Sequence, residues 1–131
     1  MTDLERAKAF FAKDTFATEV TGIEIAEVAK GYAKCRLPIE DKHKNAVGAV
    51  MGGVLFTLAD FTFAVAANFD ADAVTVTLAT QIQYLSPAKG DLLFAQSRLL
   101  KNGRHNCFYE ITVTDNCGTT VAIASVTGAH I

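Results

Sequence analysis

The sequence predicts an α+β fold in which an antiparallel sheet wraps around one long central helix. Residues 49–69 (AVMGGVLFTLADFTFAVAANF) are the most apolar stretch of the chain and contain one charged residue, Asp60. After this stretch the hydrophobic period changes to two, in segments joined by connections of hairpin length. An apolar helix and an antiparallel sheet with one apolar face bury each other most simply when the sheet curls around the helix.

Length and composition predict a single globular domain, residues 1–131. Half of the residues are hydrophobic and a fifth are charged, which is typical of a folded chain. The net charge of −2 and the scattered Lys and Arg residues argue against a nucleic-acid partner. The first residues do not form a secretory signal, and three widely spaced cysteines indicate reduced thiols. We therefore expect a cytoplasmic protein.

Caps and turns predict the elements before the central helix. Thr2 and Glu5 match the T-x-x-E capping box, which predicts a short amphipathic helix at the N-terminus. Its apolar positions are Leu4, Ala7, Phe10 and Phe11. Residues 22–39 predict two strands broken at Lys30–Gly31, and the polar residues 40–48 predict a loop into the long helix.

Four further strands are expected after the helix, which should end between residues 68 and 72. They are 73–84, 91–100, 105–114 and 119–131. In the first of them, the period of two places one apolar set on a single face: Val74, Val76, Leu78, Ile82 and Tyr84. In the third, the alternating apolar set is Cys107, Tyr109, Ile111 and Val113. The helix and several strands are more apolar than one such layer requires, so a second copy of the chain should cover the remainder.

Asp60 is the residue that decides between a structural and a functional interpretation. A membrane span is disfavoured, because a charge near its centre costs about 2.5–3.5 kcal/mol. A buried carboxylate without a partner costs several kcal/mol as well. A structural role would require hydrogen bonds from Thr57, Thr62 or a partner's backbone. No Lys, Arg or His lies within one helical turn, which favours a nucleophile or general base instead.

The paired glycines Gly52 and Gly53 begin the helix. Free N–H groups and the positive end of the helix dipole lie there, where they can stabilise a developing oxyanion. The alternative is that the glycines only permit tight packing at the helix entry. Gly52 and Asp60 are eight residues apart, hence about 12 Å along the helix. They can act on one carbonyl group only if each comes from a different chain, as in a dimer with antiparallel helices.

The pattern N-x-x-G-x-x-x-G-G with a later acid, formed by Asn45, Gly48, Gly52, Gly53 and Asp60, resembles the hotdog-fold acyl-CoA thioesterases. It is most similar to their phenylacetate-pathway (PaaI-like) branch, and QYLSPAKGD and LLKNGRHN extend the resemblance over roughly residues 20–130. The resemblance implies an enzyme that hydrolyses acyl-CoA and needs no cofactor beyond the coenzyme A of its substrate. It also implies a homodimer, often paired into a homotetramer, with active sites at the subunit interface.

The resemblance also implies a role for each matching residue. The Gly52 N–H polarises the thioester carbonyl, and Asp60 of the facing subunit attacks it or activates water. Asn45 orients substrate or water, and Thr77 supplies a hydroxyl near the acid, although the period of two puts Thr77 opposite Val76 and Leu78. The remaining substrate-binding and CoA-binding positions are Met51, Gly53, Tyr84, Lys101, Asn102, Gly103, Arg104 and His105. Among these, Lys101 and Arg104 suit phosphate contacts.

One departure from the family keeps two alternatives open. Met51 stands where many relatives have His, and a thioether is at best a weak acceptor. A non-catalytic acyl-CoA-binding or regulatory protein is therefore one alternative. A hydratase or dehydratase of the same fold is less favoured, since it needs a histidine base: His43 is expected to be solvated, His105 lies in a turn and His130 near the end of the chain. No cluster has metal-ligand spacing, so no metal is expected.

Overall fold

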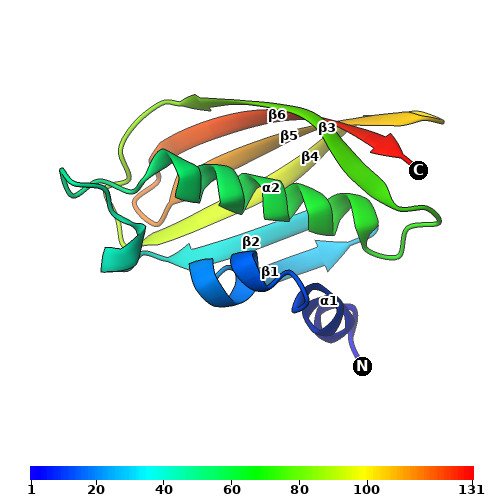
Figure 1. Cartoon of the computed structure of the whole chain (residues 1–131), viewed down its shortest axis with the longest axis horizontal. Coiled ribbons are helices and arrows are strands. Elements are labelled where there is room, and N and C mark those ends of the chain that lie inside the picture. Colours follow the sequence, from blue (N-terminus) through cyan, green and yellow to red (C-terminus); the bar gives the residue numbers. More distant parts are fainter.

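The computed structural model describes all 131 residues as a six-stranded sheet with one long helix lying across it (Figure 1). The helical elements are α1 (Asp3–Phe11), a π-helical turn (Phe16–Thr21), a 3-10 turn (Asp41–His43) and α2 (Gly52–Asn68). The strands are β1 (Glu24–Ala29), β2 (Tyr32–Pro38), β3 (Thr75–Tyr84), β4 (Leu92–Asn102), β5 (Asn106–Asp115) and β6 (Thr120–His130). The predicted α+β class and the long central helix are confirmed.

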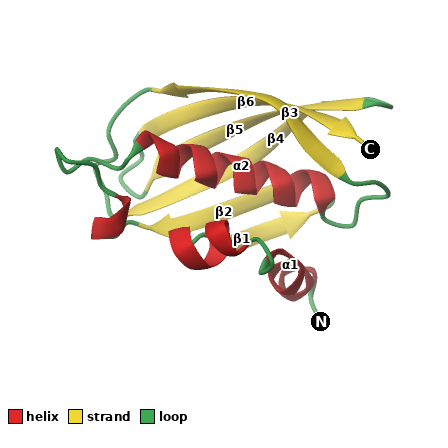
Figure 2. Ribbon diagram, in the orientation of Figure 1, coloured by secondary structure: helices red, strands yellow, loops and turns green.

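The strand order is β1-β2-β4-β5-β6-β3, and every neighbouring pair is antiparallel. Figure 2 shows the sheet curving behind α2, which packs on its concave face. The core lies between the two layers; its largest fully buried side chains include Phe63, Leu37, Leu58, Leu93 and Ile111. The alternating apolar set predicted for β5 is buried, because that face meets the helix.

Helix α1 begins at the predicted capping box. The Thr2 hydroxyl accepts from the Glu5 backbone N–H at 3.1 Å, and the Glu5 carboxylate accepts from the Thr2 backbone N–H at 3.3 Å. Phe11 is buried and meets Phe61 of α2 edge to face, with ring centroids 6.2 Å apart. Phe10, expected on the same buried face, is 59% exposed. The helix therefore docks on α2 through one aromatic side chain and leaves the other free.

Strand β3 contains a β-bulge that the sequence pattern did not predict. Pairing with β6 runs Thr77↔Gly128 and then Ala79↔Thr127, which leaves Leu78 unpaired. The bulge reverses the alternation, so Val76 lies on the face opposite to Ile82 and Tyr84. The predicted single apolar face of this strand is wrong, because one extra residue moves every later side chain to the other side.

Strand β3 is also an edge of the sheet and carries an unusual number of uncovered apolar side chains. Those in or next to the strand that are exposed are Val74, Val76, Leu78, Tyr84 and Leu85. An exposed apolar edge is a template for pairing with another strand. No helix in the structure combines the length and apolar character required to cross a membrane.

Candidate active site

The start of α2 presents two backbone N–H groups that have no acceptor within the chain, those of Gly52 and Gly53. Met51 is the N-cap and offers no side-chain hydrogen bond. The two glycines differ in their surroundings. A Cβ on Gly52 would lie 3.2–3.4 Å from the Tyr84 ring, whereas a Cβ on Gly53 would meet only the Met51 methyl at 3.9 Å. Tight packing thus explains Gly52, but nothing in the chain packs against Gly53.

Asn45 organises the loop that leads into this helix. Its side-chain oxygen accepts from the backbone N–H groups of Val47 and Ala49, both at 3.1 Å. Gly48 completes the turn with φ +86°, a left-handed conformation that favours glycine. The Asn45 side-chain oxygen is therefore occupied, while its amide N–H groups have no partner in the chain and can donate to a ligand.

Asp60 lies partly buried on the exposed face of α2 and forms no ion pair. The two hydroxyls that could have satisfied it within the helix are used elsewhere. Thr57 donates to the carbonyl oxygen of Gly53 and Thr62 to that of Leu58, each at 2.8 Å. The structural explanation that depends on these threonines is therefore ruled out within the single chain.

The electrostatic environment keeps Asp60 easier to protonate than an ordinary aspartate. Burial raises its pKa above 3.8, and the negative charge of Asp14 raises it further, while the Thr77 hydroxyl partly offsets both. Thr77 faces the helix because its partner across the ladder, Gly128, lies against Phe63. The structure thus brings Thr77 to the acid. Asp14, which follows α1, was missed from the sequence because 46 residues separate it from Asp60.

The remaining predicted residues fall near the two opposite ends of α2. At the start of α2, the Tyr84 hydroxyl donates to the Gly52 carbonyl oxygen at 3.1 Å. At the end of α2, the last residues of β4 and the turn into β5 (together residues 101–105, hereafter the β4–β5 turn) place Asn102, Gly103 and Arg104 around a cavity of about 290 Å³. One chain alone does not bring Asp60 to Gly52, because the two are eight residues apart on one helix. Nor does it bring Tyr84 to this turn, because β3 has its first residue, Thr75, at the end of the sheet where the turn lies, and Tyr84 at the other end.

Two of the three histidines are tied into the fold. His43 is 2% exposed, accepts from the Glu40 backbone N–H at 2.9 Å and bonds the Thr21 carbonyl oxygen at 2.7 Å. The expectation that His43 is solvated is therefore wrong: its contact with Thr21 spans 22 residues and leaves no local signal. The His130 ring bonds the side chains of Thr75 and Asn102 at 2.7 and 2.8 Å.

The cysteines form no disulfide, and no three His, Cys, Asp or Glu side chains are grouped so that they could hold a metal ion. The exposed face of α2 offers a carboxylate, that of Asp60, and the free backbone N–H groups of Gly52 and Gly53. A family model described as Thioesterase superfamily matches residues 47–122, the segment that contains these groups. The chain belongs to the thioesterase superfamily.

Individual relatives narrow this placement. This thioesterase is 30% identical over 120 residues to the acyl-coenzyme A thioesterase PaaI of Escherichia coli, covering 91% of this chain and 84% of that protein. The structure of E. coli PaaI superposes with a TM-score of 0.89 over 98% of this chain and 94% of that one, at 25% identity. The smu.793 protein of Streptococcus mutans, solved with acetyl-CoA, matches at 29% identity and TM-score 0.78, covering 83% and 88%. The chain is a PaaI-like hotdog thioesterase, a thioester hydrolase.

Proposed function

We propose that the protein hydrolyses an acyl-CoA to a free acid and coenzyme A in a site built from two copies of the chain. Asp60 of one subunit and the Gly52 N–H of the other act on the same thioester. The observation that carries the proposal is that α2 exposes a carboxylate without an ion-pair partner and N–H groups without an acceptor. They lie about 12 Å apart on one rigid helix, so a second helix running antiparallel is required to join them.

The chemistry follows from what each group can do. The thioester carbonyl oxygen accepts from the Gly52 N–H, which stabilises the oxyanion that forms on attack. Asp60 then acts in one of two ways: its carboxylate attacks the carbonyl carbon, or it accepts a proton from a water that attacks. In either route the C–S bond breaks, water supplies the new acid oxygen, and the coenzyme A thiolate leaves and takes up a proton. Thr77 and Asn45 assist by hydrogen bonding to the acid and to the substrate or water.

The proposed dimer uses the edge strand. Pairing β3 with its copy would cover apolar side chains that the single chain leaves exposed and would align the two α2 helices side by side. A pairing of dimers into a tetramer and a cytoplasmic location remain predictions.

Coenzyme A recognition is assigned to the exposed cations of the β4–β5 turn and to the residues near Gly52. Lys101 and Arg104 would contact phosphates, with Asn102, Gly103 and His105 shaping the turn. Tyr84, Met51 and Gly53 would contact the thioester end. The complex of the S. mutans relative with acetyl-CoA supports an acyl-CoA as the ligand.

A hydratase reaction is less well supported. His43 and His130 are already hydrogen-bonded inside the chain, and His105 lies in the turn between β4 and β5. None of the three lies on α2, so no histidine base accompanies Asp60 on that helix.

The Gly52 N–H can be tested with proline, which has no backbone N–H to donate. Gly52 is the first residue of α2, where proline is tolerated, and Met51 has ψ 137°, which a following proline accepts. In thiol-release assays on a panel of acyl-CoAs, Gly52→Pro should lower kcat by about 10²–10³-fold, the effect of losing one oxyanion donor. Gly52→Ala adds the same Cβ beside Tyr84 but keeps the N–H and is the matched control. Equal losses in both variants would contradict a role for the N–H group.

A further inference from the structure

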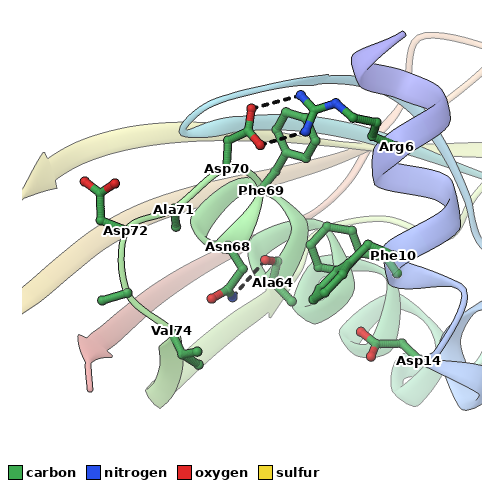
Figure 3. Close-up of a pocket in the computed structure, with 12 residues that line it drawn as sticks. Arg6, Phe10, Asp14, Ala64, Asn68, Phe69, Asp70, Ala71, Asp72 and Val74 are labelled. Carbon is green, nitrogen blue, oxygen red and sulfur yellow. Dashed lines mark hydrogen bonds and ion pairs between the residues drawn. The ribbon is translucent and has the colours of Figure 1, made fainter. Parts of the chain in front are cut away.

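A pocket of about 550 Å³ lies between α1 and the C-terminal half of α2 (Figure 3). Its apolar walls are formed by Phe10 and Phe11 of α1, Ala64 of α2, and Phe69 and Val74 after that helix. The volume is within the range of small-molecule sites, about 300–1,000 Å³. It exceeds what an acetyl group requires, so the space is available for a larger group.

The pocket adjoins the proposed catalytic acid. Ala64 lies one helical turn after Asp60, and residues four apart share a face of a helix. Asp14 lines the pocket and its charge acts on the Asp60 carboxyl, which places the two acids in one electrostatic neighbourhood. A substrate whose carbonyl meets Asp60 therefore has this pocket within reach of its acyl chain.

The walls of the pocket are held in place without a ligand. Arg6 of α1 donates two hydrogen bonds to the Asp70 carboxylate, at 2.9 and 3.0 Å, and its guanidinium lies 5.0 Å from the centre of the Phe69 ring. The Asn68 side chain bonds the Ala64 carbonyl oxygen and both backbone groups of Thr75 at 2.8–3.1 Å. The N-terminal helix is thus tied to the segment after α2 and closes one side of the pocket.

The charges around the pocket exclude some occupants. Three carboxylates line it, those of Asp14, Asp70 and Asp72. The one cation among the lining residues, Arg6, is already paired with Asp70 and also with Asp3 at 2.7 Å. Lys13, outside the lining, lies over the Phe10 ring at 5.1 Å from its centre. Lys30 lies 3.9 Å from the Asp72 carboxylate, which leaves Asp14 as the lining acid without an ion pair. A carboxylate or phosphate entering the pocket would be repelled by Asp14 and by a lining in which acids outnumber cations. An uncharged apolar group meets the aromatic and aliphatic walls instead.

We propose that this pocket holds the acyl group and makes the enzyme selective for uncharged, apolar acyl chains longer than acetyl over chains that end in a carboxylate. Helix α1 is then the element that sets substrate choice. The inference rests on the proposed function, since it assumes that the thioester carbonyl lies at Asp60.

The test compares kcat/KM for acetyl-CoA, hexanoyl-CoA and glutaryl-CoA, the last two being similar in length but different in terminal charge. The wild type should prefer hexanoyl-CoA to glutaryl-CoA by at least about tenfold. Ala64→Leu fills the pocket and should lower the hexanoyl-to-acetyl ratio by about tenfold or more. Phe10→Ala should lower the same ratio less, because Phe10 is partly exposed. Phe16→Ala, another exposed phenylalanine outside the pocket, is the matched control and should leave the ratio unchanged.

Three results would overturn the proposal. Equal losses on all three substrates in Ala64→Leu would mean that the pocket holds the part they share, the coenzyme A arm. Loss of the dimer on gel filtration would mean that the partner chain fills it. A wild-type preference for glutaryl-CoA would contradict the charge argument. If the wild type releases thiol from no thioester, the proposed function fails; the ratio of Kd values for hexanoyl-CoA and acetyl-CoA in the same variants then decides the pocket separately.

Discussion

Asp60 in the middle of α2 and Asp115 at the end of β5 are both sheltered from water, yet their surroundings are opposite. The Asp115 carboxylate accepts four backbone N–H bonds, from Lys89, Gly90, Cys117 and Thr119, at 2.7–3.1 Å. Burial alone would raise the Asp115 pKa, but these four bonds outweigh it and lower the pKa well below 3.8. Asp60 has no such donors, and its pKa is raised.

The difference separates a structural acid from a functional one. Asp115 joins two turns, because its two oxygens satisfy N–H groups from the β3–β4 and β5–β6 connections. Asp60 accepts no backbone N–H and meets only the Thr77 hydroxyl in its own chain, so its carboxylate remains available to a substrate or a second chain. A partly buried carboxylate that has no ion pair and no backbone donors, yet occupies the central helix, is best explained by its chemistry.

The largest expected effect is the loss of activity in Asp60→Asn. The amide cannot act as nucleophile or proton acceptor, so thiol release should fall by about 10²–10⁴-fold. Far-ultraviolet circular dichroism and gel filtration should match the wild type. Asp41→Asn, the same change at a fully exposed acid, is the control and should be neutral. Wild-type turnover in Asp60→Asn would remove the residue from the mechanism.

The same variant should be more stable than the wild type at neutral pH. A pKa raised on folding means that the folded state binds the Asp60 proton more tightly than the unfolded state does. Protonated Asp60 therefore adds to the free energy of unfolding; this contribution is complete below pH 3.8 and is lost as pH rises through the folded pKa. Asn is uncharged at every pH, so Asp60→Asn does not lose stability in this way as pH rises. The difference in Tm between variant and wild type should therefore be larger at pH 7 than at pH 3.5, and a difference independent of pH would contradict the raised pKa.

Asp115→Asn should reverse this behaviour. The amide keeps one accepting oxygen and turns an NH₂ group toward backbone donors, so the variant should lose several degrees of Tm at pH 7. Because the Asp115 pKa is lowered in the fold, its contribution is present above pH 3.8 and declines at lower pH. The variant and the wild type should converge in Tm on acidification. Activity per folded molecule should be unchanged.

A smaller effect is expected at Asp14. Its negative charge raises the Asp60 pKa, so Asp14→Asn should let Asp60 ionise at lower pH. The acid limb of the kcat/KM profile should move down by a fraction of a pH unit, and the shift should shrink in high salt. Glu19→Gln, an exposed acid on the π-helical turn, is the control. A shift to higher pH would have the wrong sign.

The smallest effect concerns the glycine that nothing in the chain requires. Gly53→Ala places its Cβ in ordinary contact with the Met51 methyl at 3.9 Å and should raise the free energy of unfolding by up to about 1 kcal/mol, from helix propensity alone. Gly52→Ala must displace Tyr84 and should not stabilise. If Gly53→Ala is at least as stable as the wild type but has a higher KM, a substrate or a second chain approaches that position. An unchanged KM would mean that neither contacts Gly53.

Local patterns predicted the elements well because each element carries its own signal. The capping box set the start of α1, the isolation of Asp60 stood out on an otherwise apolar helix, and period-two alternation identified β5. Each of these signals is formed by residues that are close together in the sequence, so pairing with distant strands does not alter it.

What the sequence did not predict depends on contacts between distant segments. The bulge at Leu78 arises from the register with β6 and reversed the expected face of Val76. The burial of His43 depends on Thr21, and the influence of Asp14 on Asp60 depends on how α1 docks. Each of these is a tertiary property that periodicity cannot report.

The central claim is that Asp60 and Gly52 act from different chains, and mixing two inactive variants tests it most directly. Asp60→Asn and Gly52→Pro are combined, exchanged under mild denaturant and assayed for thiol release. A mixed dimer contains one site with both wild-type groups, so random exchange should restore about one quarter of wild-type activity. If both groups acted from one chain, every site in the mixture would lack one of them. Activity that stays at the level of the separate variants, with mixed dimers shown to form, would contradict the account.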